Sequence, residues 1–312
     1  MAHQALTVTL ADILAAQQRL VGGLLETPVL RSAGLDKLAG AELFFKSEHQ
    51  QVTGSFKARG ALNAVIGLTE AQARRGVATH SSGNHGAALA WAAASRGIPA
   101  YIVVPENAAG VKKRNIGQHG AEIIECESTL PAREASLAAV VARTGANFIP
   151  PYDDARIIAG QGTVGLELMA AVPDLDDIVT PVGGGGLLAG TLLAVAGGPQ
   201  VFGAEPVMAD DAYRSFTSGV RVLSHTPKTM ADGLRTTLGA LNFEIIQGRC
   251  AGILLVSEAE ISAAMRLIWE ELQQVVEPSS AVTLAAVLRY PEHFNNRRIG
   301  LILTGGNCDS SF

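Results

Sequence analysis

The stretch Asp177–Gly197, DIVTPVGGGGLLAGTLLAVAG, places four consecutive glycines between two apolar runs. The first run predicts a buried strand and the second a helix, with the glycines in the turn that joins them. Four glycines in a row cost backbone entropy, so they suit a position where the chain wraps closely around a ligand. Their N–H groups and the following helix N-terminus predict a phosphate-binding site. Since the loop has no Gly-Lys-Ser/Thr ending, it is not a P-loop.

Two other interpretations of this glycine loop stay open on its sequence alone. Gly184, Gly186 and Ala189, followed by Glu205 at the end of the next apolar run, fit a loose dinucleotide-binding fingerprint. A tight structural turn without any ligand is the third interpretation, because a short glycine pattern is weak evidence. The loop therefore predicts a phosphate but does not say which molecule carries it.

Outside the glycine loop, short apolar runs alternate with longer alanine-rich runs along most of the chain. The apolar runs predict strands and the alanine-rich runs predict helices. This alternation is typical of an α/β fold with open, twisted, parallel-rich sheets that helices cover on both faces. Ligands of such folds bind at the carboxyl ends of the strands. We expect strands at 41–48, 99–105, 121–127, 147–151, 177–183, 200–206 and 298–306, and helices at 86–97, 111–120, 130–145, 187–198 and 257–275.

The composition of the 312 residues indicates a folded, acidic protein. Hydrophobic residues make up 48% of the chain and charged residues 17%, and the net charge is −5. An acidic chain argues against nucleic-acid binding. Cys126, Cys250 and Cys308 are scattered, which fits a reducing compartment such as the cytoplasm better than a disulfide framework. The N-terminus has no basic start followed by an apolar block, so we expect no signal peptide.

The segment Ile178–Ala204 carries no charge and is long enough to span a bilayer. Its glycines and Pro199 instead indicate a strand, a loop, a helix and a turn within a buried core. We therefore expect that this chain has no membrane span.

Lys57 lies in the stretch GSFKARGALNA and is one of only six lysines in the chain. It opens a predicted helix of small residues, where the helix dipole disfavours a cation. A surface lysine in a turn is the ordinary interpretation, but a lysine neutralised as a Schiff base explains the position better. A Schiff-base lysine together with a phosphate site points to pyridoxal 5'-phosphate as the cofactor.

Six motifs occur in the same order as in fold-type II pyridoxal phosphate enzymes, which the chain resembles over nearly its whole length. They are GSFKARGALNA, SSGNHG, GQGTVGLE, PVGGGGLLAG, AEP with ADD, and LTGGN. The resemblance is greatest to serine racemases and to the serine/threonine and 3-hydroxyaspartate dehydratases. It implies a two-domain fold like that of the tryptophan synthase β chain, with residues 1–65 and 151–312 in a large cofactor-binding domain. Residues 66–150 would form a small inserted domain that carries the substrate-binding loop.

The resemblance implies a set of cofactor contacts. Lys57 would bind the cofactor covalently and later act as a base, and Phe56 would flank the ring. Asn84 would hydrogen-bond the hydroxyl oxygen of the ring, and Gly183, Gly184, Gly185 and Gly186 would hold the phosphate. Thr304 would meet the pyridine nitrogen through a neutral hydroxyl, which does not hold that nitrogen protonated as an aspartate would. A weaker electron sink suits reactions in which a leaving group departs soon after proton removal.

The resemblance also implies a substrate site. Backbone N–H groups of the loop Ser81, Ser82, Gly83, Asn84 and His85 would bind the α-carboxylate. Ser82 can act as a second acid/base on the opposite face of the ring, which permits racemization without proving it. Arg133 is either a solvated helix residue or the partner of a distal substrate carboxylate. Thr236 stands where the racemases have serine, which leaves the specificity open.

A divalent-cation site is the last feature that the resemblance implies. It would consist of Glu205, the carbonyl of Ala209, and Asp211, which are oxygen donors suited to Mg²⁺ or to Ca²⁺ or Mn²⁺. A solvated acidic turn is the alternative. Glu205 cannot serve both this site and a dinucleotide ribose.

The reaction that the resemblance favours is elimination of water from a β-hydroxy amino acid, such as 3-hydroxyaspartate or serine, to give a 2-oxo acid and ammonia. Racemization of an amino acid, with both activities at one site, is the close alternative. An NAD-dependent oxidoreductase that uses the glycine loop and a non-catalytic small-molecule sensor are the rivals from other classes. The family expectation is a cytoplasmic homodimer.

Overall fold

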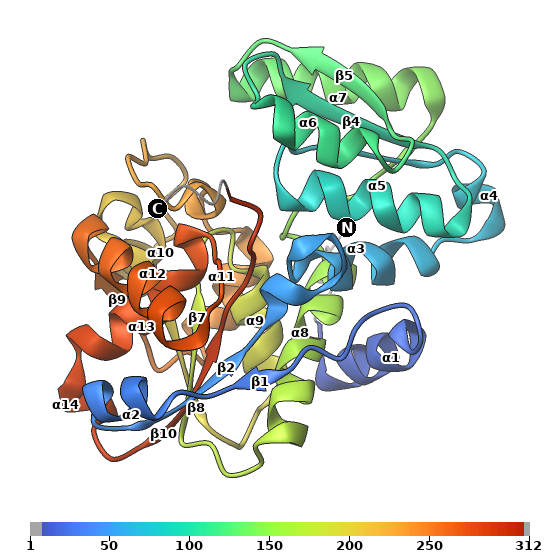
Figure 1. Ribbon diagram of the computed structural model, residues 1–312. Coiled ribbons are helices and arrows are strands. Elements are labelled where there is room, and N and C mark those ends of the chain that lie inside the picture. The colour runs from blue at the N-terminus through green and yellow to red at the C-terminus, as the bar shows by residue number, and fades with distance from the viewer. Residues whose placement is uncertain (1–7, 309–312) are drawn as a thin grey trace.

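The computed structural model describes residues 8–308, which form two sheets with helices on both faces of each (Figure 1). Every strand pair is parallel except β1 with β2, so the predicted α/β class with parallel-rich sheets is confirmed. The larger sheet has the order β1 (Val29–Leu30), β2 (Glu42–Lys46), β10 (Arg298–Ile302), β7 (Asp177–Pro181), β8 (Gln200–Pro206), β9 (Gly252–Val256). The smaller sheet has the order β5 (Glu122–Cys126), β4 (Ala100–Pro105), β3 (Val77–His80), β6 (Asn147–Phe148).

The parallel register decides which loops meet. In the larger sheet Leu301 of β10 lies opposite Phe45 of β2 on one side and Val179 of β7 on the other. Because these strands run in the same direction, the residues that follow β10 and β7 emerge at one edge. Those residues are the LTGG segment and the glycine loop.

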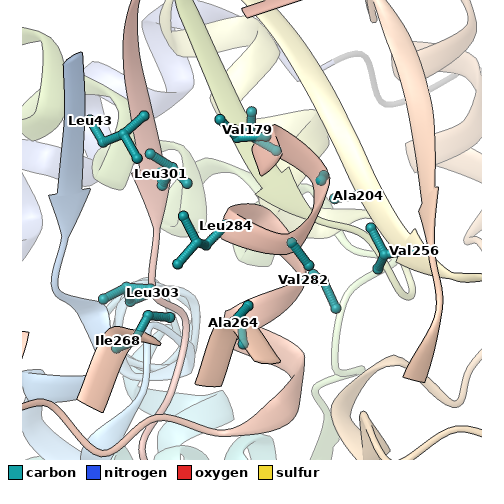
Figure 2. Packing of buried hydrophobic residues seen from close by; sticks show 14 of the residues in the cluster. Leu43, Val179, Ala204, Val256, Ala264, Ile268, Val282, Leu284, Leu301 and Leu303 are labelled. Carbon is teal, nitrogen blue, oxygen red and sulfur yellow. The ribbon is translucent and has the colours of Figure 1, made fainter. Parts of the chain in front are cut away.

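Two helical layers enclose the larger sheet. On one face lie α2 (Ala33–Ala39), α12 (Glu258–Leu272) and α13 (Pro278–Arg289). Figure 2 shows Leu284 of α13 beside Leu301 of β10, and Val282 toward Val256 of β9. On the other face lie α1 (Leu10–Leu20), α8 (Ala155–Ala171), α9 (Gly186–Ala194) and α11 (Ala240–Gln247).

The smaller sheet lies between α5 (Asn84–Arg96) on one face and α7 (Leu130–Thr144) on the other, with α6 (Gly110–Gly117) beside it. The alanines of α5 allow close packing against α3 (Lys57–Ile66), and α3 in turn packs on α8. We call the larger sheet with its helices the larger lobe and the smaller sheet with its helices the smaller lobe. All four strands lie within the segment 66–150 expected to form an inserted domain, and the exact boundaries stay a prediction. The remaining helices are α4 (Glu70–Ala73), α10 (Asp211–Ser218), α14 (Pro291–Phe294) and the 3₁₀ turns η1 (Glu48–Gln50), η2 (Val52–Gly54), η3 (Val207–Ala209) and η4 (Asp232–Leu234).

Each expected strand and helix is present, although several ends differ by a few residues. The strand expected at 147–151 is only two residues long, because Pro150 and Pro151 have no N–H to continue the ladder. The capping box of α12 is formed by Ser257 and Glu260. The uncharged segment 178–204 forms β7, a loop, α9 and part of β8, and no helix within residues 8–308 could cross a membrane. The strands β1 and β9 and the helices α1, α2, α4, α8, α10, α11, α13 and α14 were not among the expected elements.

Candidate active site

Lys57 is the first residue of α3, and its side chain is held in a poorly hydrated place. Its Nζ atom donates a hydrogen bond to the carbonyl of Pro151 at 2.8 Å, and it lies 5.1 Å from the centre of the Phe56 ring. Burial lowers the pKa of Lys57 to about 8, because a charged amine loses its hydration there. The hydrogen bond goes to a carbonyl and not to a carboxylate, so no opposite charge restores the usual pKa. Lys57 is therefore a nucleophilic amine at mildly alkaline pH.

The residues that follow β10 lie next to this lysine. The backbone N–H of Phe56 donates to the carbonyl of Thr304 at 3.0 Å, and Ser55 forms an isolated β-bridge with Gly305. The Thr304 side chain is buried, with 5% of its surface exposed, and its hydroxyl lies 3.1 Å from that of Ser280. The lysine segment and the LTGG segment are thus joined directly by the backbone.

The glycine loop closes the site on a third side. Gly185 has φ of +89°, a conformation that favours glycine, and it caps α9. A Cβ atom on Gly184 would lie 2.2 Å from the Tyr152 ring, and one on Gly186 would lie 3.1 Å from the Tyr152 carbonyl. Tyr152 follows Pro151, the residue that accepts the Lys57 hydrogen bond. Gly184 and Gly186 are therefore required by the close approach of Tyr152, whose neighbour Pro151 contacts the lysine.

The loop between β3 and α5 approaches from the smaller lobe. Asn84 begins α5, and its amide donates to Oε1 and Oε2 of Glu277 at 2.9 and 3.1 Å. Its carbonyl oxygen accepts a hydrogen bond from Asn307 at 2.8 Å. A Cβ on Gly86 would lie 2.1 Å from the carbonyl of Ser81, so the turn is tight. The Ser82 hydroxyl forms no hydrogen bond with the part of the chain that the structure describes.

His85 differs from its neighbours in this loop because its side chain points into the core. It is buried, and Nε2 lies 3.0 Å from the carbonyl of Ile149. Burial, together with the positive charge of Lys57, lowers the pKa of His85 to about 3. A neutral, inward-facing imidazole leaves only the backbone N–H of His85 to face a ligand.

Arg133 and Thr236, the two predicted specificity residues, lie on opposite lobes. Arg133 is a half-buried residue of α7, and its guanidinium forms no ion pair or hydrogen bond with residues 8–308. Burial and the charge of Arg133 both lower the pKa of His80, the residue just before the Ser81 loop. The Thr236 hydroxyl lies 2.8 Å from the Tyr152 hydroxyl, close to the glycine loop.

The predicted cation ligands lie at the end of β8. Oε1 of Glu205 accepts from the N–H of Tyr213 at 2.6 Å, while the buried Oε2 has no partner within the described chain. Burial, and then the neighbouring charge of Asp211, raise the pKa of Glu205 well above its usual range. An unpaired buried carboxylate oxygen beside a second carboxylate suits a hard cation. Residues 8–308 contain no cluster of three or more His, Cys, Asp or Glu side chains arranged for a metal, so such a site would depend on the Ala209 carbonyl.

Three residues of this site were not identified from the sequence: Glu277, Tyr152 and Ser280. Burial raises the pKa of Glu277 to about 6, and the charge of Asp232 adds to the effect. Pro278 directly after Glu277 is a helix-start signal that could have revealed α13 and its first turn.

Three groups lie together at the carboxyl ends of parallel strands: the desolvated amine of Lys57, the glycine loop and the neutral, buried hydroxyl of Thr304. This set is what a phosphorylated aldehyde cofactor needs, so the fold and the site define a lysine-dependent cofactor enzyme of the α/β class. The chain belongs to the family described as pyridoxal-phosphate dependent enzyme, whose model matches residues 5–305. Membership in this family favours pyridoxal phosphate over a dinucleotide as the ligand of the glycine loop.

Two curated relatives are equally similar to this chain. It is 48% identical over 313 residues to serine racemase of Dictyostelium discoideum, covering 98% of this chain and 96% of that protein. It is also 48% identical over 304 residues to beta-hydroxyaspartate dehydratase of Paracoccus denitrificans, covering 96% of each. The crystal structure of the Dictyostelium serine racemase superposes with a TM-score of 0.93, covering 97% of this chain and 99% of that one.

Proposed function

We propose that this chain is a pyridoxal phosphate-dependent dehydratase that removes water from a β-hydroxy amino acid, with 3-hydroxyaspartate or serine as the preferred substrate. The products are a 2-oxo acid and ammonia. The observation that carries the proposal is the Lys57 amine, whose pKa of about 8 leaves a usable neutral fraction beside Thr304 and the glycine loop. Equal identity to a racemase and a dehydratase supports this pair of reactions.

Pyridoxal phosphate, when bound, supplies an electron sink for negative charge at the substrate Cα. Lys57 would hold the cofactor, and its neutral amine would remove the proton from Cα. The backbone N–H groups of residues 81–85 would bind the α-carboxylate at the start of α5. Gly183–Gly186 would hold the phosphate, Asn84 would face the ring hydroxyl, and Phe56 would lie against the ring. The neutral hydroxyl of Thr304 would face the ring nitrogen, which favours prompt loss of the β-hydroxyl.

Racemization at the same site is the second candidate, and Ser82 is the residue that favours it. Its partly buried hydroxyl has no hydrogen-bond partner in the described chain, so it is free to deliver a proton to Cα from the face opposite Lys57. We expect Ser82→Ala to lose racemization while elimination from L-substrates survives. Full racemase activity in that variant would rule out Ser82 as the second base.

The substrate assay measures ammonia and 2-oxo acid release from serine, threonine and each stereoisomer of 3-hydroxyaspartate, with chiral chromatography of the remaining amino acid. Arg133, with its unpaired guanidinium near the Ser81 loop, would bind the β-carboxylate of hydroxyaspartate. We expect Arg133→Ala to damage activity on hydroxyaspartate far more than on serine. Equal losses on both substrates would refute this role, and no ammonia or racemization from any of them would refute the proposed reactions.

Three further properties belong to this proposal. A divalent cation, Mg²⁺ or Ca²⁺ or Mn²⁺, would bind Glu205, the Ala209 carbonyl and Asp211. The protein would be a homodimer, and it would act in the cytoplasm, where its three cysteines stay reduced.

A further inference from the structure

A second hydroxyl lies directly behind Thr304. Ser280 is in the first turn of α13, none of its surface is exposed, and its Oγ atom is 3.1 Å from Thr304 Oγ1. The same oxygen accepts the N–H of Gly305 at 2.9 Å and lies 2.8 Å from the Gly305 carbonyl. That carbonyl also accepts the N–H of Glu277 at 2.9 Å, so it keeps a partner whichever way the Ser280 proton points.

The protons of this pair can be arranged in two ways. A hydroxyl has one proton and two lone pairs, and one lone pair of Ser280 is taken by the Gly305 N–H. If Ser280 donates to the Gly305 carbonyl, its second lone pair accepts the Thr304 proton, and Thr304 presents only lone pairs to the cofactor. If Ser280 donates to Thr304 instead, Thr304 presents its own proton. Every buried group is satisfied in both arrangements.

We propose that Ser280 is a positioning residue that lets Thr304 accept a hydrogen bond from a protonated ring nitrogen of the cofactor as well as donate one to an unprotonated ring nitrogen. The inference rests on the proposed function, because it needs the ring nitrogen at Thr304. Without Ser280, a Thr304 that accepts from a protonated ring nitrogen would bury its own O–H without a partner, which is costly. Ser280 therefore increases the proton affinity of the ring nitrogen. A more protonated ring prolongs negative charge at Cα and favours reprotonation over loss of the β-hydroxyl.

The position of Ser280 is rigid enough for this role. Residues Ser279–Val287 of α13 are all buried, and Figure 2 shows Val282 and Leu284 packed toward the strands of the larger sheet. Ser279, one residue earlier, faces elsewhere and accepts the N–H of Gly233 at 3.1 Å. Ser279 is therefore a matched control: a buried serine in the same turn that does not touch Thr304.

The test loads wild type, Ser280→Ala, Ser280→Thr and Ser279→Ala with ¹⁵N-labelled pyridoxal phosphate and records the NMR shift of the ring nitrogen from pH 5.5 to 9. We expect Ser280→Ala to lower the ratio of protonated to unprotonated ring about ten-fold at a given pH, as one lost buried hydrogen bond predicts. Ser280→Thr and Ser279→Ala should resemble wild type. The ratio of racemization to elimination should fall in Ser280→Ala alone.

Borohydride reduction and peptide mass mapping on the same samples separate two kinds of failure. No cofactor fixed to Lys57 in wild type would overturn both the proposed function and the role of Ser280. Cofactor fixed to Lys57, with the same ring-nitrogen shift in wild type and Ser280→Ala, would overturn the role of Ser280 alone. A shift that changes equally in Ser279→Ala would also overturn it, because the effect would then come from the helix turn and not from Thr304.

Discussion

Asn84 and Glu277 form a hydrogen bond between the two lobes, from the first residue of α5 to the residue that caps α13. The amide nitrogen of Asn84 donates to both carboxylate oxygens of Glu277, and its amide oxygen accepts a hydrogen bond from Asn307. The side-chain plane of Asn84 is thus fixed from both ends before any ligand binds.

Glu277→Gln should change how stability depends on pH. The pKa of Glu277 is about 6 in the folded protein and 4.5 ordinarily, so the folded state binds this proton more tightly than the unfolded chain. The contribution of this proton to the free energy of unfolding is therefore full below about pH 4.5 and is lost as the pH rises through about 6. The change amounts to about 2 kcal/mol. Urea unfolding of the cofactor-free protein between these pH values should show that change in wild type relative to Glu277→Gln. Exposed Glu292→Gln is the control, and a pH-independent difference between wild type and Glu277→Gln would contradict the expectation.

Capture of pyridoxal phosphate should report the lowered pKa of Lys57. With a pKa of about 8 and not 10.5, the neutral fraction of the amine at pH 7 is larger by about 300-fold. We expect the rate of covalent capture by cofactor-free protein to rise with pH and level off above about pH 8, as followed by absorbance. Lys57→Ala should give no borohydride-stable adduct, whereas Lys37→Ala should behave as wild type. A rate that still climbs steeply at pH 9.5 would show an ordinary lysine.

Gly184→Ala should weaken cofactor binding through a clash with Tyr152. The added Cβ would lie 2.2 Å from the aromatic ring, and overpacking of this kind costs about 1–3 kcal/mol. We expect the Kd for pyridoxal phosphate to rise about ten-fold or more, measured by fluorescence titration. Gly117→Ala, where the nearest atom is 3.6 Å away, is the matched control. The double variant Gly184→Ala with Tyr152→Ala should recover part of the affinity, and no recovery would point to a cause other than the ring.

Arg59→Met should destabilise the fold that presents Lys57. Arg59 is 1% exposed and pairs with Glu48, which is fully buried, at 2.7 Å, and with Glu167 at 2.6 Å. Without the guanidinium the buried Glu48 carboxylate has no cation, whereas Glu167 keeps Lys46 at 2.7 Å. Leaving one buried charge uncompensated costs about 3–5 kcal/mol. Urea unfolding measures this loss, and Arg143→Met, which breaks an exposed pair with Glu122, should change stability little. Similar effects of the two variants would mean that the buried network is not held as described.

Added Mg²⁺ or Ca²⁺ should raise Tm by a few degrees, because a ligand that binds only the folded state stabilises it. Burial raises the pKa of Glu205, so protons compete with the cation and the effect should shrink as the pH falls. Glu205→Gln should abolish the shift in Tm, whereas Asp210→Asn, one residue away from Asp211, should keep it. An equal shift in both variants would place the cation elsewhere.

The sequence was sufficient to predict the layers of the fold, because strand and helix patterns alternate and glycines mark the turns. It did not predict α8 and α13, which are buried nearly all round and therefore lack a polar face. In α13 the hydroxyls of Ser279, Ser280 and Thr283 look like loop composition, yet each is bonded inside the protein.

Lys57 and the glycine loop carry a local signal in the sequence, and their roles in binding the cofactor stay predictions. The roles of Glu277, Tyr152 and Ser280 were not accessible from the sequence, because they follow from how distant segments pair. The register of β10 between β2 and β7 decides which residue of α13 meets Thr304, and no local pattern encodes it. The predicted roles of Ser82, Arg133 and Thr236 depend on a substrate and stay predictions.

The hydrogen bond from Phe56 to the carbonyl of Thr304 has a consequence for biosynthesis. On the ribosome Lys57 emerges well before β10 and Thr304, the segment that sets its position. A chain that has not been translated as far as Thr304 therefore cannot assemble the cofactor site. The cofactor site would then form only after this distant segment docks, which ties cofactor capture to the folding of the larger sheet.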